Sequence, residues 1–494
     1  MAANWHPKPG DRVIRRPRLS PPRLRRILGI TSLYSAGYGN VGSSIYYALG
    51  LIAVVAAGAT PVVLLIAGII FIFTALTYAE GTAMYPEAGG SSSFARHGFN
   101  ESLGFVAGWA LMLSYVVTMA ISAFTVPFYL AYFWPPLKES PVAATSLAIV
   151  IILLLAALNL RGVKETSFLN ITLAVMDVAM QVLVVVLGLV FLFNPGLILQ
   201  RVTSLWPSTT NLISGIAVAA IAYTGVETIS QLAEETKHPQ VRAPRAYLLM
   251  MLTVMVIFTG ISTIAFSVMS PQELAQNWSH DPLAGIVHYL PIEIAAKAPS
   301  DPVGQIVYIR LAEVMGAFLP FLVALLASTI LLIAANSGLM GISRLAFSLG
   351  HHRLVPPVLG RVHHRFHTPY VSIAIFSGVA ILILLPAFFR ADFFSQLGSL
   401  YAFGSLFSFA LAHAAILMLR IRKPETPRPF KLRANIRFGN CELPITAILG
   451  LLSTFAVWII LVIVQPYSRW LGFAWMLAGL VLYSIYRHRA KTRE

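Results

Sequence analysis

The stretch 36-AGYGNVGSSIYYALG-50 carries three closely spaced glycines, an asparagine and two serines in the middle of an otherwise apolar segment. A second stretch, 215-GIAVAAIAYTGVETISQ-231, is similar, with Thr224, Gly225 and Glu227 near its centre. A membrane helix keeps its backbone hydrogen bonds closed unless the freed groups line a cavity or are buried in protein. We therefore expect two interrupted helices with a polar binding site between them. The alternative explanation is that the small residues only allow tight helix packing.

The composition around these stretches is that of an integral membrane protein. Of the 494 residues, 57% are hydrophobic and only 11% are charged, and the mean hydropathy is +0.77. Soluble domains carry about 25% charged residues, so a soluble multidomain protein of this length is excluded. The single cysteine, Cys441, excludes an internal disulfide and a cysteine-based metal site.

Twelve membrane-spanning helices are predicted, because a spanning helix needs about 20 mostly apolar residues. They lie at 28–49, 61–84, 103–133, 142–160, 168–193, 211–233, 246–269, 311–335, 370–388, 393–419, 444–465 and 470–486. With the N-terminus inside, 29 of the 35 lysines and arginines fall in cytoplasmic segments, as the positive-inside rule requires. Both termini are therefore expected in the cytoplasm of a cell whose membrane the chain crosses. The net charge of +16 is a topology signal and does not call for nucleic acid as a partner.

The order of the helices predicts an internal repeat. The interrupted helices are the first and the sixth, which is typical of two five-helix halves of inverted topology with a site between them. The predicted fold is an all-α membrane protein with this inverted five-plus-five repeat and two additional helices. The expected parts are a cytoplasmic tail (1–27), two repeats (28–193 and 194–419), a cytoplasmic linker (420–443), helices eleven and twelve (444–486) and a second tail (487–494).

Four long motifs resemble the amino acid–polyamine–organocation permease family, over about residues 28–440. They are 39-GNVGSS-44, 78-YAEGTAMYPEAGGSSSFARHGF-99, 222-AYTGVETISQLAEETKHPQVRAPRA-246 and 343-SRLAFSLGHHRLVPPVLGRVHHRFHTPY-370. The resemblance implies a bacterial amino acid permease type with the leucine-transporter-type bundle. It also implies transport of amino acids or related amines by alternating access, through proton symport or exchange. Helices eleven and twelve match the family only by number and position.

The resemblance also implies where a substrate binds. The first interrupted helix would receive the substrate carboxylate through Val41, Gly42, Ser43 and Ser44. The sixth would line the amino-group and side-chain end of the substrate through Ile221, Ala222 and Thr224, next to Gly225. Tyr223 stands at the family's aromatic position and would form part of a gate.

Two acids inside the predicted helices are candidates for proton coupling. Asp177 lies near the middle of the fifth helix, where a charged side chain is costly and usually functional. In some proton-coupled family members a lysine occupies about this place, so an acid there changes the expected mechanism. A hydrogen bond to a neighbouring helix is the structural alternative. Glu227 follows the sixth-helix break and is the second proton-coupling candidate. A polar network that ties helix six to its neighbours is favoured for it over direct substrate contact.

Two further residues are candidates for gating. Glu80, in the second helix, is predicted to serve packing or gating. Arg344 is predicted to belong to an inner gate and to pair with Glu234 or Glu235.

Five histidines fall in one predicted cytoplasmic loop: His351, His352, His363, His364 and His367. A membrane metalloenzyme needs several such sets from different loops, so a metal site is disfavoured. No Walker-type phosphate loop is present, which disfavours ATP-driven transport. We interpret the chain as a secondary active transporter for amino acids that is not an enzyme and needs no cofactor, with the proton as a candidate coupling ion. The alternatives are a polyamine or organic-cation carrier, a membrane enzyme that uses the histidine loop, and a nutrient sensor that does not transport.

Overall fold

The apolar segments of the sequence form helices in the computed structural model, which describes residues 26–161, 167–366, 368–390, 393–438 and 441–491. The first half of the chain contains α1 (Ile30–Val41), η1 (Gly42–Ser44), α2 (Ile45–Ala56), η2 (Ala57–Ala59), α3 (Thr60–Met84), α4 (Ser91–Gly98), α5 (Glu101–Leu130), α6 (Pro136–Glu139), α7 (Pro141–Arg161), α8 (Ser167–Phe191), α9 (Pro195–Ser204), α10 (Thr209–Ala219), η3 (Ala220–Tyr223), α11 (Thr228–Gln231) and η4 (Ala233–Glu235). Here η denotes a 3₁₀ turn. The predicted tail 1–27 falls almost entirely outside the described residues, as does the end of the tail 487–494.

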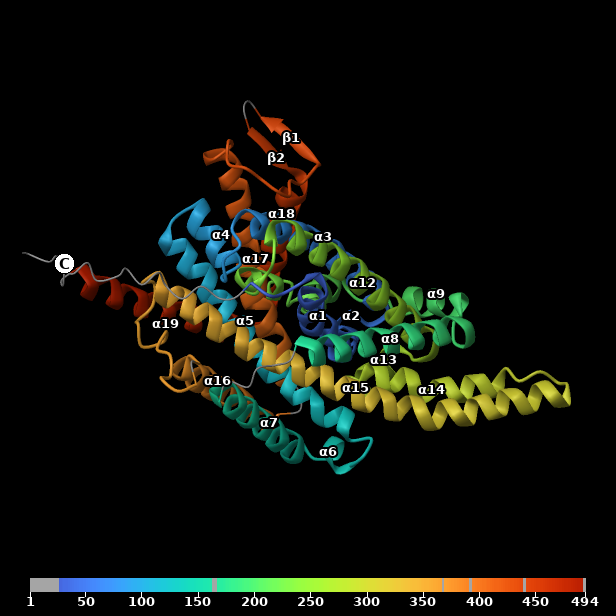
Figure 1. Ribbon diagram of the computed structural model, residues 1–494. Coiled ribbons are helices and arrows are strands. Elements are labelled where there is room, and N and C mark those ends of the chain that lie inside the picture. Colours follow the sequence, from blue (N-terminus) through green and yellow to red (C-terminus); the bar gives the residue numbers. More distant parts are fainter. Residues whose placement is uncertain (1–25, 162–166, 367, 391–392, 439–440, 492–494) are drawn as a thin grey trace, which may run out of the picture.

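The second half is also mainly helical. It contains α12 (Pro239–Val268), α13 (Pro271–Asn277), α14 (Pro282–Ala296), α15 (Pro302–His351), α16 (Tyr370–Leu384), η5 (Leu385–Phe388), α17 (Phe393–Arg422), β1 (Asn435–Phe438), β2 (Cys441–Pro444), α18 (Ile445–Val464) and α19 (Pro466–Lys491). The two strands pair antiparallel at the end of the predicted linker 420–443, which β2 exceeds by one residue, and they protrude beyond the helices, as Figure 1 shows.

Eleven helical segments of the described chain are long and apolar enough to cross a membrane. Ten of them match ten predicted helices one to one, and the first, Ile30–Met84, contains the other two. A single helix of its 55 residues would be about 80 Å long, whereas the hydrocarbon core is only about 30 Å thick. Ala57, with a φ of 44°, interrupts this segment between α2 and α3. The architecture is therefore a multi-spanning helical bundle consistent with twelve crossings, while the inverted repeat and the domain boundaries stay predictions.

The eighth predicted helix, 311–335, is much too short. In the structure α15 has 50 residues, and Figure 1 shows it as a long rod across the molecule with α14 beside its first part. A hydropathy window marks only the part of a helix that lies in hydrocarbon, and about 20 residues suffice for that. The helix continues at both ends, so Arg344 and His351 belong to a helix and not to a loop.

The centre of the bundle is α5, whose most apolar stretch is 94% buried. Glycines of two neighbouring helices let the backbones approach α5 closely. A Cβ atom on Gly338 of α15 would lie 2.8 Å from the carbonyl oxygen of Tyr115, and one on Gly404 of α17 would lie 2.7 Å from that of Ala110. Such contacts between small residues are typical of membrane helix packing. In contrast, α18 and α19 are apolar but only about a quarter of the residues in their apolar stretches are buried, as in helices that face lipid.

The two ends of the bundle can be told apart by chain direction. We call the end where α1 begins and α15 finishes the N-terminal face; it includes Leu28, Glu235 and Arg344. The opposite face holds the end of α5 and the start of α14.

Candidate functional site

The sixth predicted helix is broken where the sequence indicates. After α10 and η3, residues 224–227 leave the helix before α11 starts. Thr224 is extended, with ψ of 155°, and Gly225 has a φ of 105° that L-amino acids rarely adopt. A Cβ atom on Gly225 would also lie 2.8 Å from the side chain of Asn40. Glycine is therefore required here both by conformation and by space.

The first predicted helix is interrupted more mildly. Gly42, Ser43 and Ser44 form the 3₁₀ turn η1 between α1 and α2, and Gly42 keeps helical angles of −63° and −30°. The Ser43 hydroxyl donates to the carbonyl of Asn40 at 2.8 Å. The Tyr38 ring covers Gly42, since a Cβ atom there would lie 2.6 Å from it. The backbone therefore tightens at this point and does not unwind as we expected.

The two interruptions lie against each other in the core. The Asn40 amide nitrogen donates to the Thr228 hydroxyl at 2.7 Å, which joins α1 to α11. The backbone N–H of Gly225 donates to the Glu227 carboxylate at 3.2 Å. Two buried acceptor atoms in this cluster, Oδ1 of Asn40 and Oε1 of Glu227, have no hydrogen-bond partner. A buried polar group without a partner costs about 1–3 kcal/mol, so this cluster has unused binding capacity.

The structure brings the predicted substrate-binding residues of the two helices together. All of them are buried, and η1 contacts η3: Val41, Gly42, Ser43 and Ser44 on one side, and Ile221, Ala222, Tyr223, Thr224 and Gly225 on the other. The Ser44 and Tyr47 hydroxyls lie 3.2 Å apart. Tyr223, the predicted gate residue, donates to the carbonyl of Leu64 at 3.0 Å and stacks on Phe71, so it is held against α3.

Asp177 is fully buried in α8 and is held by three hydrogen bonds. Tyr46 donates to its Oδ1 at 2.5 Å, while Tyr38 and Gln181 donate to Oδ2 at 3.1 and 2.9 Å. Tyr38 and Tyr46 stand four residues before and after Gly42, so the carboxylate connects both sides of η1. The alternative explanation for Asp177 was a hydrogen bond to a neighbouring helix, and the structure contains such bonds, from Tyr38 and Tyr46. They lie on the two sides of the interruption of helix one.

The N-terminal face closes over this cluster. A cavity of about 30 Å³ lies between α1, α5, α8, α11 and α15, lined by residues that include Ser35, Gln231 and Arg344. Arg344 forms an ion pair with Glu235 at 3.0 Å, one of its two predicted partners. Outside this pair, burial and the nearby charge of Glu87 raise the pKa of Glu234.

Backbone hydrogen bonds connect a residue just before the first interrupted helix with the segment that follows the second interrupted helix. The N–H of Leu28 donates to the carbonyl of Glu235 at 3.0 Å, and the N–H of Lys237 donates to the carbonyl of Leu28 at 3.0 Å. The start of α1 and the segment after α11 are therefore fastened together.

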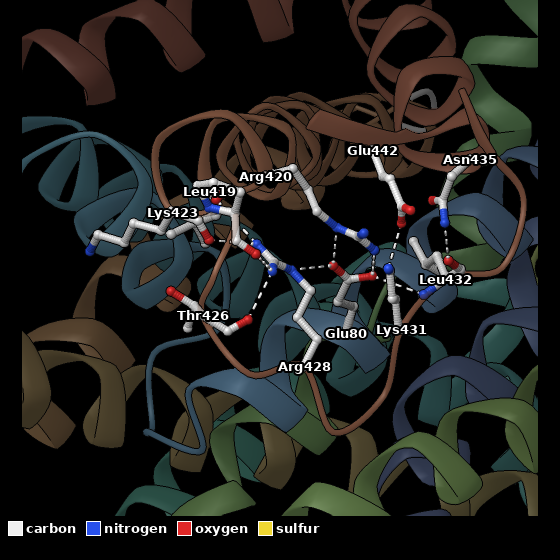
Figure 2. A network of polar contacts seen from close by, with 11 residues as sticks. Glu80, Leu419, Arg420, Lys423, Thr426, Arg428, Lys431, Leu432, Asn435 and Glu442 are labelled. Atoms are coloured by element: carbon white, nitrogen blue, oxygen red, sulfur yellow. Dashed lines mark hydrogen bonds and ion pairs between the residues drawn. The ribbon is translucent and has the colours of Figure 1, made fainter. Parts of the chain in front are cut away.

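Glu80 lies apart from the two interruptions, in a buried ion pair with the end of α17. Arg420 donates to both carboxylate oxygens at 2.8 and 2.7 Å. The backbone N–H of Leu432 donates at 3.0 Å, and Arg428 lies 3.7 Å away. Figure 2 shows these groups converging on Glu80 from the linker that leads to the β-hairpin. The contacts fasten this linker to α3.

The histidine-rich segment forms no metal centre among the residues described. No three histidine, cysteine or acidic side chains come together there or elsewhere in the described ranges. His363 stacks on His364 and on Phe366, with ring centroids 4.7 and 4.9 Å apart. His367 lies outside the described residues.

Sequence reasoning missed several polar partners in the core. The spacing of Tyr38 and Tyr46 around Gly42 places them on one helix face, but nothing local points to Asp177. His413 of α17 is fully buried between the hydroxyls of Thr77 and Thr74, at 2.8 and 3.2 Å. The sequence did contain a signal for this contact, because a histidine in the middle of a spanning segment usually has polar partners.

Comparison with known proteins agrees with this architecture. A family model described as "Amino acid permease" matches residues 28–486. The branched-chain amino acid permease BcaP of Bacillus subtilis is 25% identical over 94% of both chains, and that of Lactococcus lactis is 26% identical over 95% of this chain and 96% of its own. The low-affinity putrescine importer PlaP of Escherichia coli is 24% identical over 94% of both chains. The chain therefore belongs to the amino acid permease family and is a multi-pass membrane transporter, not an enzyme.

Proposed function

We propose that this protein carries amino acids with aliphatic side chains across the cytoplasmic membrane by alternating access, with the substrate bound between the two interrupted helices. The observation that carries the proposal is the meeting of these helices at Asn40, Gly225 and Thr228, where buried polar atoms lack partners. The similarity to branched-chain amino acid permeases supports the substrate class.

The walls of the site fit the two ends of an amino acid. Hydroxyls at Ser43 and Ser44 suit the carboxylate, and the N–H groups of η1 would add to them once this turn opens. The carbonyl of Ile221 and the acceptor atoms of Asn40 and Glu227 suit the ammonium. The side chain of Ile221 packs beside Leu51 over Gly398, so the neighbouring space is aliphatic.

We further propose that protons drive this transport through Asp177 and Glu227. Both carboxyl groups are fully buried, and none of the ion pairs in the described part of the chain involves either. Acidic side chains inside a membrane bundle typically mark proton relays in transporters. Protonation of Asp177 would weaken its hold on Tyr38 and Tyr46, and with it the arrangement around η1.

The N-terminal face is the cytoplasmic side in this proposal. The distribution of lysine and arginine supports this orientation. The Arg344–Glu235 pair then acts as the inner gate, because Arg344 lines the cavity whose wall also includes Thr228 of α11. Glu80, which we predicted as a gating residue, would act indirectly by holding the linker to α3.

An amine is the second candidate substrate. The unpaired Oε1 of Glu227 would suit a cationic group, and one of the relatives is a putrescine importer. An amine substrate without a carboxylate would not need the hydroxyls of η1.

The test is uptake into proteoliposomes of labelled leucine, isoleucine and valine, with labelled putrescine in parallel. We expect accumulation of the amino acids under an inward proton gradient and its loss in Asp177→Asn. The matched control is Glu313→Gln, an exposed acid of α15. Uptake only into vesicles preloaded with amino acids would indicate exchange. Uptake of putrescine alone would favour the amine, and no flux of either compound would overturn the proposal.

A further inference from the structure

A second cavity, of about 420 Å³, lies on the opposite face, outside the site between the interrupted helices. It is formed by the end of α5, α6, the start of α14 and the middle of α15. Its size falls within the range of small-molecule sites, about 300–1,000 Å³. Aromatic rings form much of its wall: Phe128, Tyr129, Tyr132, Trp278 and His288.

Three charged side chains line the cavity, Lys138, Asp281 and the exposed Glu139, and the first two lie side by side. The Lys138 ammonium lies 3.0 and 2.7 Å from the two oxygens of Asp281, and 4.4 Å from the centre of the Trp278 ring. Asp281 is nearly buried, whereas 38% of the Lys138 side chain is exposed. An ammonium has three donors and a carboxylate has about four lone pairs. Both groups can therefore bind further partners without giving up their own contact.

The Lys138–Asp281 pair matches the two charged groups of a zwitterion. A ligand carboxylate can accept the remaining hydrogen bond of Lys138, and a ligand ammonium can donate to Asp281 beside it. Ala284, Pro320 and Ala324 form an apolar wall for a side chain. A purely apolar guest would leave the two charges facing hydrocarbon, which is unfavourable.

The inner wall of the cavity is connected to helix one. Tyr129, which is 2% exposed, donates to the backbone carbonyl of Tyr46 at 2.7 Å, and their rings meet edge to face at 5.4 Å. Tyr46 in turn donates to Asp177. A molecule in this cavity thus touches a ring that positions α2, the half of helix one after η1.

We propose that this cavity is an outer binding site for a free amino acid, held through its carboxylate by Lys138 and through its ammonium by Asp281. The inference rests on the proposed function, since it supplies the same class of substrate to the opposite face. It captures substrate before entry and raises the local substrate concentration near helix one.

The test measures how many labelled leucine molecules bind per chain, with the purified full-length protein in lipid nanodiscs. We expect two. Lys138→Met should weaken the outer binding by at least about tenfold, because it removes a charge-assisted hydrogen bond, whereas Lys138→Arg should keep it. Ser44→Val should remove the other molecule. The control is Lys297→Met, an exposed lysine at the end of α14. Ala284→Phe fills the cavity without removing either charge and should act as Lys138→Met does.

The outcomes separate the two proposals. One leucine per chain, lost in Ser44→Val and unaffected by Lys138→Met and Ala284→Phe, would overturn the outer site and leave the proposed function intact. One leucine that is lost only in the cavity variants would support the outer site and remove the central one. In transport assays the outer site predicts that Lys138→Met raises the KM for leucine with little change in the maximal rate. A lower maximal rate at unchanged KM would contradict recruitment.

Discussion

The side-chain amide of Asn40 in α1 donates a hydrogen bond to the hydroxyl of Thr228 in α11 over 2.7 Å. The two residues are separated by 188 positions in the chain, yet each stands within three residues of a helix interruption. This bond joins the two interrupted helices at the place where we propose that substrate binds. Its strength therefore bears on both stability and transport.

Thr228→Val is expected to lower both the stability of the protein and its transport rate. The substitution keeps the shape of the side chain but leaves the buried Asn40 amide without its acceptor, which costs about 1–3 kcal/mol. We expect a lower Tm and a reduced leucine uptake rate per folded molecule. The control is Thr203→Val, because the exposed Thr203 hydroxyl bonds only to carbonyls of its own helix, α9. An unchanged Tm in Thr228→Val would contradict the importance of this bond.

Gly225→Ala is expected to be much more damaging than a glycine substitution at an open helical position. A φ of 105° costs a residue with a Cβ atom about 1–3 kcal/mol, and that atom would meet Asn40 at 2.8 Å. Gly378→Ala in α16 is the matched control, since a Cβ atom there meets nothing within 4 Å. Thermal unfolding and uptake should separate the two variants. Equal behaviour would show that the break tolerates a side chain.

The sequence was sufficient to predict most of the helices and the form of one of the two helix interruptions. Hydropathy depends on the solvent around a segment, so it locates spanning helices well and misses the ends that leave the membrane, as in α15. The break at Gly225 was predictable because a threonine, a glycine and an acid stand within four residues there, at Thr224, Gly225 and Glu227. At Gly42 glycine permits unwinding without requiring it, and here the Tyr38 ring packs on a closed turn.

The partners of the buried ionisable groups were much harder to predict. Arg344 and Glu235 could be paired because both lie in segments next to the same face. Asp177 bonds to tyrosines 131 and 139 positions away, and Glu80 to an arginine 340 positions away. Such contacts depend on which helices become neighbours, and one sequence by itself does not encode this in any local pattern.

The Glu80–Arg420 pair yields a prediction about stability. Arg420→Met leaves the fully buried carboxylate of Glu80 without its main cation, and breaking a buried pair in this way costs about 3–5 kcal/mol. The double variant Glu80→Gln with Arg420→Met should recover part of the loss, because the carboxylate charge is removed together with its main cation and Arg428 keeps its hydrogen bonds to backbone carbonyls. Arg310→Met serves as the control, since the Arg310–Glu313 pair is exposed. A double variant no more stable than Arg420→Met alone would contradict this account.

Glu87 predicts a pH-dependent contribution to stability. Burial by itself would raise the pKa of its carboxyl group, but the hydrogen bond with His97 and the charge of Arg96 outweigh burial and lower the pKa to about 2, from 4.5. A carboxyl whose pKa is lowered by folding stabilises the protein above its unfolded pKa, and this contribution is lost as the pH falls towards the folded pKa. The Tm difference between wild type and Glu87→Gln should therefore be largest near pH 7 and shrink below about pH 4.5. A difference that is constant between pH 7 and pH 3 would show that the charge of Glu87 is not responsible.

The proposed inner gate predicts a charge-swap rescue. In Arg344→Glu the new carboxylate faces Glu235 across a contact that now measures 3.0 Å, so the pair repels and the N-terminal face should open more readily. Because such a pair is partly exposed, we expect only about 1 kcal/mol of coupling between its members. Uptake into proteoliposomes should fall in Arg344→Glu and in Glu235→Arg, and the combined variant should recover a large part of it. Combining Arg344→Glu with Glu234→Arg provides the specificity control, because the ion pair in the structure is with Glu235 and not with its neighbour. If the Glu234 combination rescued uptake equally well, the gate would depend on the net charge of this face and not on one specific pair.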